Sequence, residues 1–117
     1  MKKSAATLRG VVRLYHTTDA PDQIMAEGFR DGEGQYLTTN VYRGVWLADV
    51  PLDSNEGAKG EHALVLEIPE PVVVPFEWVE ERKTYREFLV PAETVNRYPV
   101  VERLSIYDER FWDLREG

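Results

Sequence analysis

Three side chains that could take part in chemistry lie in segments where strands are predicted: His16, Trp46 and Glu87. A carboxylate such as Glu87, held in a partly dry cleft, would bind a sugar hydroxyl or stabilise a developing positive charge. The indole of Trp46 offers a stacking platform for a flat ring, and a histidine at a strand end is a positioned hydrogen-bond donor. Each also has a structural explanation: the exposed face of an edge strand for Glu87, a second small core for Trp46, and a satisfied core or rim position for His16.

The residue types that are missing argue against several kinds of site. The chain has no cysteine, which rules out disulfides, a thiolate nucleophile and cysteine-based zinc or iron–sulfur centres. Its two histidines, His16 and His62, lack metal-ligand spacing with each other or with a carboxylate pair. The sequence has no glycine-rich phosphate loop or nucleophile elbow, and Ser54, beside Asp53 and Glu56, has no histidine near it in sequence. We therefore expect neither metal catalysis nor a serine hydrolase.

Alternating apolar residues predict the strands that must position these side chains. His16 shares one face of the first strand with Leu14. Val45 and Leu47 point toward the core, which turns Trp46 to the opposite face. The predicted strands are Val11–His16, Val45–Ala48, His62–Ile68, Val72–Phe76, Arg86–Val90 and Tyr98–Ile106, with a loop or weak edge hairpin over Arg30–Asn40.

One helix is predicted near the start of the chain. Thr18 or Asp19 would cap it, with Pro21 in its first turn. Gly28 would end it. Shorter features are one helical turn each in Glu77–Thr84 and Pro91–Val95, and an aromatic tail, Tyr107–Leu114, that packs back on the body. Because regular helices do not separate the strands and the late strands are joined by short turns, we predict an α+β fold with a small, mainly antiparallel sheet.

Length and composition are those of one globular domain. The chain has 117 residues, 43% hydrophobic and 30% charged, and we expect a flexible N-terminus over 1–10 and a single domain over 11–117. A net charge of −7 argues against non-specific nucleic-acid binding through phosphates. No segment approaches the ~20 apolar residues of a membrane span, and Met1–Gly10 lacks the apolar region of a secretion signal. As written, the sequence is that of a soluble, cytoplasmic protein that does not contact membranes, and the compartment itself stays open.

Three motifs, read in chain order, resemble those of the ADP-ribosyltransferase family. The first, Leu14–Thr18, precedes the predicted helix that ends in Glu27-Gly28-Phe29; the second is Gly44–Asp49, and the third is Tyr85–Val90. They are similar to the diphtheria-toxin and poly(ADP-ribose) polymerase side of the family, which carries a His-Tyr-Glu triad on separate strands. In this chain Trp46 takes the place of the triad's tyrosine. The resemblance covers most of the chain and implies a split, mainly antiparallel sheet with one N-terminal helix.

The resemblance also implies that NAD is the substrate and that no metal is needed. It implies that Glu87 binds the hydroxyl of the nicotinamide ribose and stabilises an oxocarbenium-like transition state, while His16 holds the 2′-hydroxyl of the adenosine ribose. The main chain of Thr17 and the side chain of Ser54 would bind the nicotinamide carboxamide, and Trp46 would stack on the nicotinamide ring. The residues expected to contact NAD are thus His16, Thr17, Trp46, Ser54 and Tyr85, with Glu87 and His16 as the catalytic pair.

These implied roles predict mono-ADP-ribosylation or NAD hydrolysis by a toxin or a modifying enzyme, with an unknown protein or nucleic-acid acceptor. Tyr85, rather than a glutamate, stands two residues before Glu87, which argues against the arginine-modifying branch. Three other functions stay open. The chain could be a degenerate member of the fold that binds a nucleotide or a protein without chemistry. It could be an RNA 2′-phosphotransferase-like enzyme, although that family is more arginine-rich, or a small β-rich interaction domain without a ligand.

Overall fold

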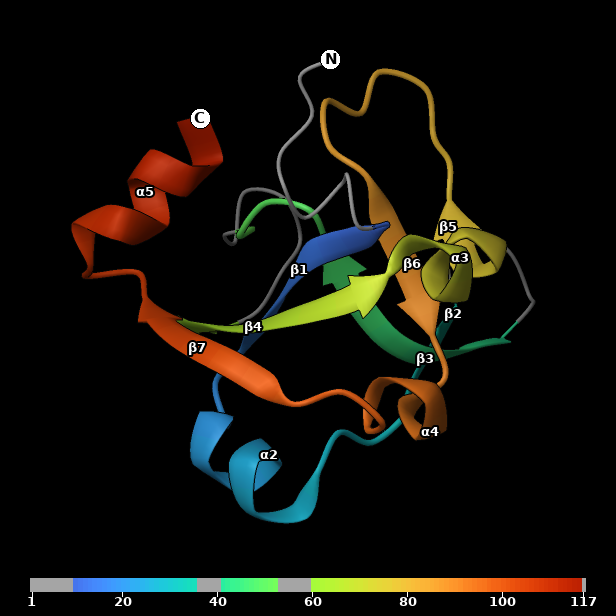
Figure 1. The fold of residues 1–117 in the computed structure, drawn as a ribbon, viewed down its shortest axis with the longest axis horizontal. Coiled ribbons are helices and arrows are strands. Elements are labelled where there is room, and N and C mark those ends of the chain that lie inside the picture. Colours follow the sequence, from blue (N-terminus) through green and yellow to red (C-terminus); the bar gives the residue numbers. More distant parts are fainter. Residues whose placement is uncertain (1–9, 36–40, 53–59, 117) are drawn as a thin grey trace.

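The computed structural model describes residues 10–35, 41–52 and 60–116 (Figure 1). In chain order the elements are β1 (Val11–Thr18), α2 (Pro21–Glu27), β2 (Gly32–Gln35), β3 (Val41–Ala48), β4 (His62–Pro69), α3 (Glu70–Val73), the 3-10 helix η2 (Val74–Phe76), β5 (Glu77–Trp78), β6 (Glu87–Val90), α4 (Ala92–Val95), β7 (Val100–Ser105) and α5 (Glu109–Glu116).

The strands form one sheet, in which the order along the main path is β5-β6-β3-β1-β4-β7 and β2 pairs with β3 as a side branch. Every pairing recorded between these strands is antiparallel. The structure therefore confirms an α+β fold with a mainly antiparallel sheet. It also shows that β6 lies between β3 and β5, so Glu87 is not on an edge strand. The structural explanation of Glu87 as an edge-strand residue is wrong.

β1 and β3 pair over a shorter stretch than the other neighbours. β1 pairs with β4 along its whole length, but with β3 only through Tyr15 and Ala48. Earlier in β3, the main chain from Val41 to Gly44 pairs with β2 instead. Val45–Leu47 therefore border a gap in the strand pairing between β1 and β3, which we call the β1–β3 seam.

Apolar side chains are buried on both faces of the sheet. One cluster collects alternate residues of β1, β3, β4 and β6 and is closed by Phe29, which follows α2, and by Val95 of α4. The other cluster contains Tyr15 of β1 and Phe111 of α5, together with side chains from β4 and β7. α5 thus covers the face opposite to α2 and α4, as the separation of these helices in Figure 1 illustrates.

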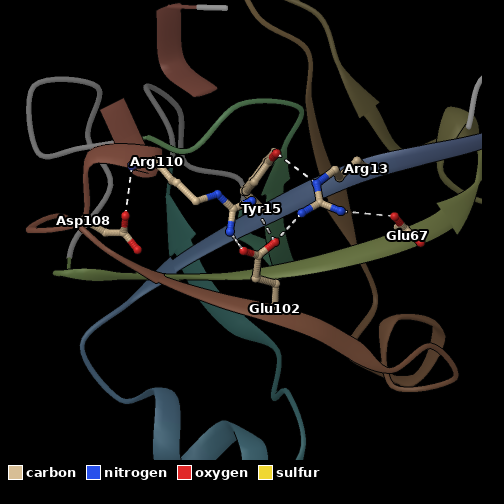
Figure 2. Close-up of polar contacts among 6 residues, drawn as sticks. All are labelled: Arg13, Tyr15, Glu67, Glu102, Asp108 and Arg110. Carbon is tan, nitrogen blue, oxygen red and sulfur yellow. Dashed lines mark hydrogen bonds and ion pairs between the residues drawn. The ribbon is translucent and has the colours of Figure 1, made fainter. Parts of the chain in front are cut away.

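A charged network ties α5 to the sheet (Figure 2). Arg13 of β1 reaches Glu67 of β4 at 3.1 Å and Glu102 of β7 at 2.5 Å. Arg110 of α5 bonds the same carboxylate of Glu102, and Nε of Arg13 donates to the hydroxyl of Tyr15 at 3.2 Å. Isolated surface ion pairs contribute little, but several charges that share one carboxylate act as a network. Glu102 therefore joins β1, β7 and α5.

The bounds of α2 follow the predicted signals only in part. The helix starts at Pro21 and ends before Gly28, whose φ is +88° and whose N–H donates to the carbonyl of Ile24 at 2.7 Å. The predicted caps are wrong, because Ala20 holds the N-cap position without a side-chain bond to the helix. The Thr18 hydroxyl instead accepts the N–H of Ala20 at 2.9 Å, which orders the turn before the helix.

Two predictions between β4 and β6 are also wrong. Val72–Phe76 was expected to be a strand, but it lies in α3 and η2. Pro71 and Pro75 lie in the first turns of these helices, where a missing N–H costs no hydrogen bond. Glu77–Thr84 was expected to form a helical turn, but its first two residues form β5 because they pair with β6.

The C-terminal tail forms a helix that the sequence did not predict. α5, with eight residues, is the longest helix among the described residues, whereas the sequence predicted one helix of consequence near the start. Its formation depends on tertiary contact, because so short a helix is marginal alone and Phe111 is fully buried. The prediction that this tail packs back on the body is confirmed. In the described part of the chain, no helix has the length and apolar character needed to cross a bilayer.

Candidate functional site

The three motifs lie on three neighbouring strands, β1, β3 and β6, and the first two meet at the β1–β3 seam. His16 shares the face of Leu14, and its ring packs edge-on against Phe29 with centroids 5.3 Å apart. Its Nδ1 lies 2.8 Å from the main-chain oxygen of Trp46. A carbonyl can only accept, so Nδ1 carries the proton in this bond. The histidine side chain therefore bridges β1 and β3 where their main chains do not pair.

This bond decides what His16 can offer a ligand. Burial lowers the pKa of His16 below its usual value, and the hydrogen bond with Trp46 opposes this shift only in part. The neutral ring with its proton on Nδ1 is thus favoured, which leaves a lone pair on Nε2. No described residue is recorded as bonding Nε2. The sequence predicted a donor at this position, whereas the atom left for a ligand is an acceptor.

Trp46 is on the face that the alternation predicted. Val45 and Leu47 are buried, whereas 37% of Trp46 is exposed. Its ring meets the ring of Trp78 from β5, with centroids 5.4 Å apart and planes at 76°. This edge-to-face contact restrains an indole that is otherwise half open to solvent. The sequence does not indicate the role of Trp78, because a two-residue strand has too few positions to show an alternating pattern.

Glu87 starts β6 beside this aromatic pair. Its register partners are Ala48 of β3 on one side and Trp78 of β5 on the other. Its side chain is 16% exposed, and Oε1 lies 2.6 Å from Nζ of Lys83. Lys83 reaches Glu80 at the same distance. Glu87 is therefore a largely buried carboxylate that an ammonium neutralises, which is how a protein accommodates such a charge.

Lys83 pairs with carboxylates on both sides of it in the chain. Glu80 and Glu87 lie three residues before and four residues after Lys83, in a connection that is not helical, so the contacts come from the path of this connection rather than from helical spacing. Burial alone would lower the pKa of Lys83, but its hydrogen bonds and charge interactions with Glu80 and Glu87 outweigh burial and raise it. The lysine is accordingly a stable cation at neutral pH.

Asp49 fixes the main chain next to Glu87. Its Oδ1 accepts the N–H of Arg86 at 2.9 Å, and its own N–H donates to the carbonyl of Arg86 at 3.0 Å. At the other end of the same motif, Gly44 has φ +155°, and a Cβ there would lie 3.1 Å from the Leu89 side chain and the Val90 carbonyl. Both ends of Gly44–Asp49 thus serve the close pairing of β3 with β6.

The guanidinium of Arg86 is held by acidic residues rather than left for a ligand. It donates to both oxygens of Glu77, at 3.0 and 2.9 Å, and to Glu70 at 3.1 Å. The fork to Glu77 raises the pKa of Arg86 and holds that of the Glu77 carboxyl below its usual value. This cluster ties β5 and α3 to the start of β6.

The remaining predicted contacts with NAD are less closely grouped. The Thr17 hydroxyl donates to the carbonyl of Leu52 at 2.9 Å, so this side chain secures the segment after β3. Tyr85 is half-buried, with Nζ of Lys83 5.5 Å from the centre of its ring. Ser54 lies outside the described residues.

The described residues contain no cluster of three or more histidines and carboxylates suited to a metal ion. No protein-family model, curated protein or solved structure matches this chain.

Proposed function

We propose that this protein is an NAD-dependent mono-ADP-ribosyltransferase, which cleaves the nicotinamide–ribose bond and transfers ADP-ribose to an acceptor or to water. The observation that carries the proposal is the convergence of the three motifs on β1, β3 and β6. His16 bonds the main chain of Trp46, and Glu87 is the register partner of Ala48, two residues further along β3. Three segments far apart in sequence therefore lie on neighbouring strands, with Trp46 and Glu87 on one face of the sheet and His16 reaching the β1–β3 seam from the face of Leu14.

The chemistry asks for a carboxylate at the carbon that becomes positive. As the glycosidic bond breaks, nicotinamide leaves with the bonding electron pair, and positive charge develops on the ribose. Glu87 stabilises that charge and binds a hydroxyl of the same ribose, and its low exposure strengthens both interactions. The acceptor then bonds to the ribose carbon and loses a proton; with water as the acceptor, the product is free ADP-ribose.

The other residues position the substrate. Trp46 stacks on the nicotinamide ring, and Trp78 restrains the indole from its edge. Stacking stabilises the bound substrate as well as the transition state, so Trp46 contributes to positioning more than to the chemical rate. His16 accepts a ribose hydroxyl through Nε2, because Nδ1 donates to the chain. The main chain of Thr17 binds the carboxamide.

The proposal is tested by nicotinamide release from NAD. We expect Glu87→Gln to lower the rate by about 10²–10³-fold, the usual loss when one transition-state contact is removed. Glu93→Gln is the matched control, since Glu93 is exposed on α4, which follows the end of β6 opposite to Glu87. Mass spectrometry of the protein and of added acceptors separates transfer from hydrolysis by the mass of one ADP-ribose. Full activity of folded Glu87→Gln would contradict the proposed role of Glu87.

One observation favours a second candidate, a module that binds NAD or another nucleotide without turnover. The carboxylate of Glu87 already bonds Lys83, so it is not free to act as it stands. This candidate predicts that wild type and Glu87→Gln both bind NAD and that neither releases nicotinamide. The RNA 2′-phosphotransferase alternative gains no such support, because Arg13 and Arg86 are both engaged by carboxylates.

A further inference from the structure

Lys83 already fills the position on Glu87 that a cationic ligand would take. Its Nζ lies 2.6 Å from Oε1 of Glu87 and 2.6 Å from Oε1 of Glu80, and its side chain is 16% exposed. The same ammonium lies 5.5 Å from the centre of the Tyr85 ring. Two carboxylates and an aromatic ring around an ammonium are the groups that select a positive charge. This group therefore shows which ligand charge the surroundings of Glu87 favour.

The contacts of Lys83 are local, so they can change without disturbing the sheet. Glu80 and Lys83 belong to the connection between β5 and β6, and only Glu87 belongs to a strand. In that connection Val79 is 81% exposed, and Arg82 is exposed with φ +69°. When Lys83 leaves Glu87, the ammonium can stay paired with Glu80, but the largely buried carboxylate of Glu87 is left without a cation until a cationic ligand takes that place. The connection thus has two electrostatically satisfied states: Lys83 on Glu87, or Lys83 on Glu80 with a cationic ligand on Glu87.

We propose that Lys83 is an internal latch: it occupies Glu87 in the free protein, and a ligand with a cationic ring must displace it. The proposal rests on the proposed function, since the pyridinium ring of NAD is such a ligand, and it adds a preference for the cation over a neutral ring. The apparent affinity is the intrinsic affinity multiplied by the fraction of molecules whose site is open. A latch that is closed in nine of ten molecules therefore weakens binding about tenfold.

The test measures binding rather than turnover. The probe is 1-methylnicotinamide, a permanent pyridinium cation, and neutral nicotinamide is its uncharged counterpart. Isothermal titration calorimetry compares wild type with Lys83→Met, which removes the ammonium, and with Lys83→Arg, which keeps a cation in reach of both carboxylates. Arg82→Met is the matched control, because it removes one positive charge from the adjacent exposed position. Lys83→Gln serves if Lys83→Met does not fold.

We expect Lys83→Met to bind the cation about tenfold more tightly than wild type, as expected when a latch is removed. Lys83→Arg, Arg82→Met and wild type should bind it alike, and neutral nicotinamide should gain little from any substitution. The proposal is overturned if Lys83→Met binds the cation no more tightly than wild type, or if no variant binds the cation. It is also overturned if Arg82→Met increases the affinity for the cation as much as Lys83→Met does, or if Lys83→Met increases the affinity for both probes equally. Because this binding experiment does not depend on nicotinamide release, its result can be interpreted even if the protein proves not to be an enzyme.

Discussion

The imidazole of His16 holds the main chain of Trp46, with Nδ1 2.8 Å from the Trp46 carbonyl oxygen. The bond lies at the β1–β3 seam, where the main chains of the two strands pair only through Tyr15 and Ala48. A side chain from the first motif thus fixes the backbone that bears the candidate stacking ring of the second. The same bond sets the tautomer of His16 and so the atom that a ligand can reach.

Stability should depend on pH through His16. Its pKa is lowered in the folded chain, so just below the ordinary value the unfolded chain binds more protons. The contribution is complete above about pH 6.5 and is lost as the pH falls toward the lowered pKa. We expect the free energy of unfolding to fall between about pH 7.5 and about pH 5.5, and this fall to be smaller in His16→Asn, whose amide can still donate to Trp46. Denaturant titrations at both pH values measure it, and equal falls in the two proteins would refute the assignment.

Removing the Asp49 carboxylate should loosen the start of β6. Asp49→Ala leaves the N–H of Arg86 without its acceptor, which costs about 1–3 kcal/mol. Because Glu87 follows Arg86 directly, we also expect nicotinamide release to fall. Asp49→Asn keeps an oxygen at the same position and should recover most of both losses. Denaturant unfolding and the release assay measure the two effects, and equal losses in both variants would exclude the hydrogen bond as the cause.

The orientation of Trp46 should depend on Trp78. Trp78→Leu removes the edge-to-face contact, worth about 0.5–1.5 kcal/mol, whereas Trp78→Phe keeps an aromatic partner. We expect NAD to bind more weakly to Trp78→Leu and nearly normally to Trp78→Phe. Trp112→Leu is the control, because Trp112 lies on α5 and contacts Phe111 instead. Calorimetric titration with NAD measures the affinity of each variant. A similar loss of affinity in Trp78→Leu and Trp112→Leu would show that the effect is not specific to the Trp46 contact.

The helix α5 should depend on a single buried ring. Phe111 is fully buried in the cluster around Tyr15, and Phe111→Ala should cost about 3–5 kcal/mol of unfolding free energy. Phe111→Leu should cost less because it leaves a smaller void. Limited proteolysis should then cleave near α5 first in Phe111→Ala. A loss below about 1 kcal/mol would mean that α5 is held by the charged network of Glu102 rather than by its apolar contact.

Part of the candidate site followed from the sequence, and part did not. His16, Trp46 and Glu87 were predicted from motifs, and the burial of Val45 and Leu47 confirms the face assigned to Trp46. Trp78, Lys83 and Asp49 were missed as neighbours of the site. Trp78 belongs to a strand of two residues, and the bonds of Asp49 join positions that are distant in sequence. Such contacts leave no periodic signal in the chain itself.

The sequence by itself determined the local structure: which residues of β1 share a face, which face of β3 points to the core, where α2 starts at Pro21, and where Gly28 ends it. These features depend on side-chain alternation and backbone freedom, which act within a few residues. Tertiary structure alone decided that β6 lies between β3 and β5, that α5 forms, and that Lys83 rests on Glu87. Strand order and helix docking depend on burial shared between distant segments, and that free energy exists only once the segments meet.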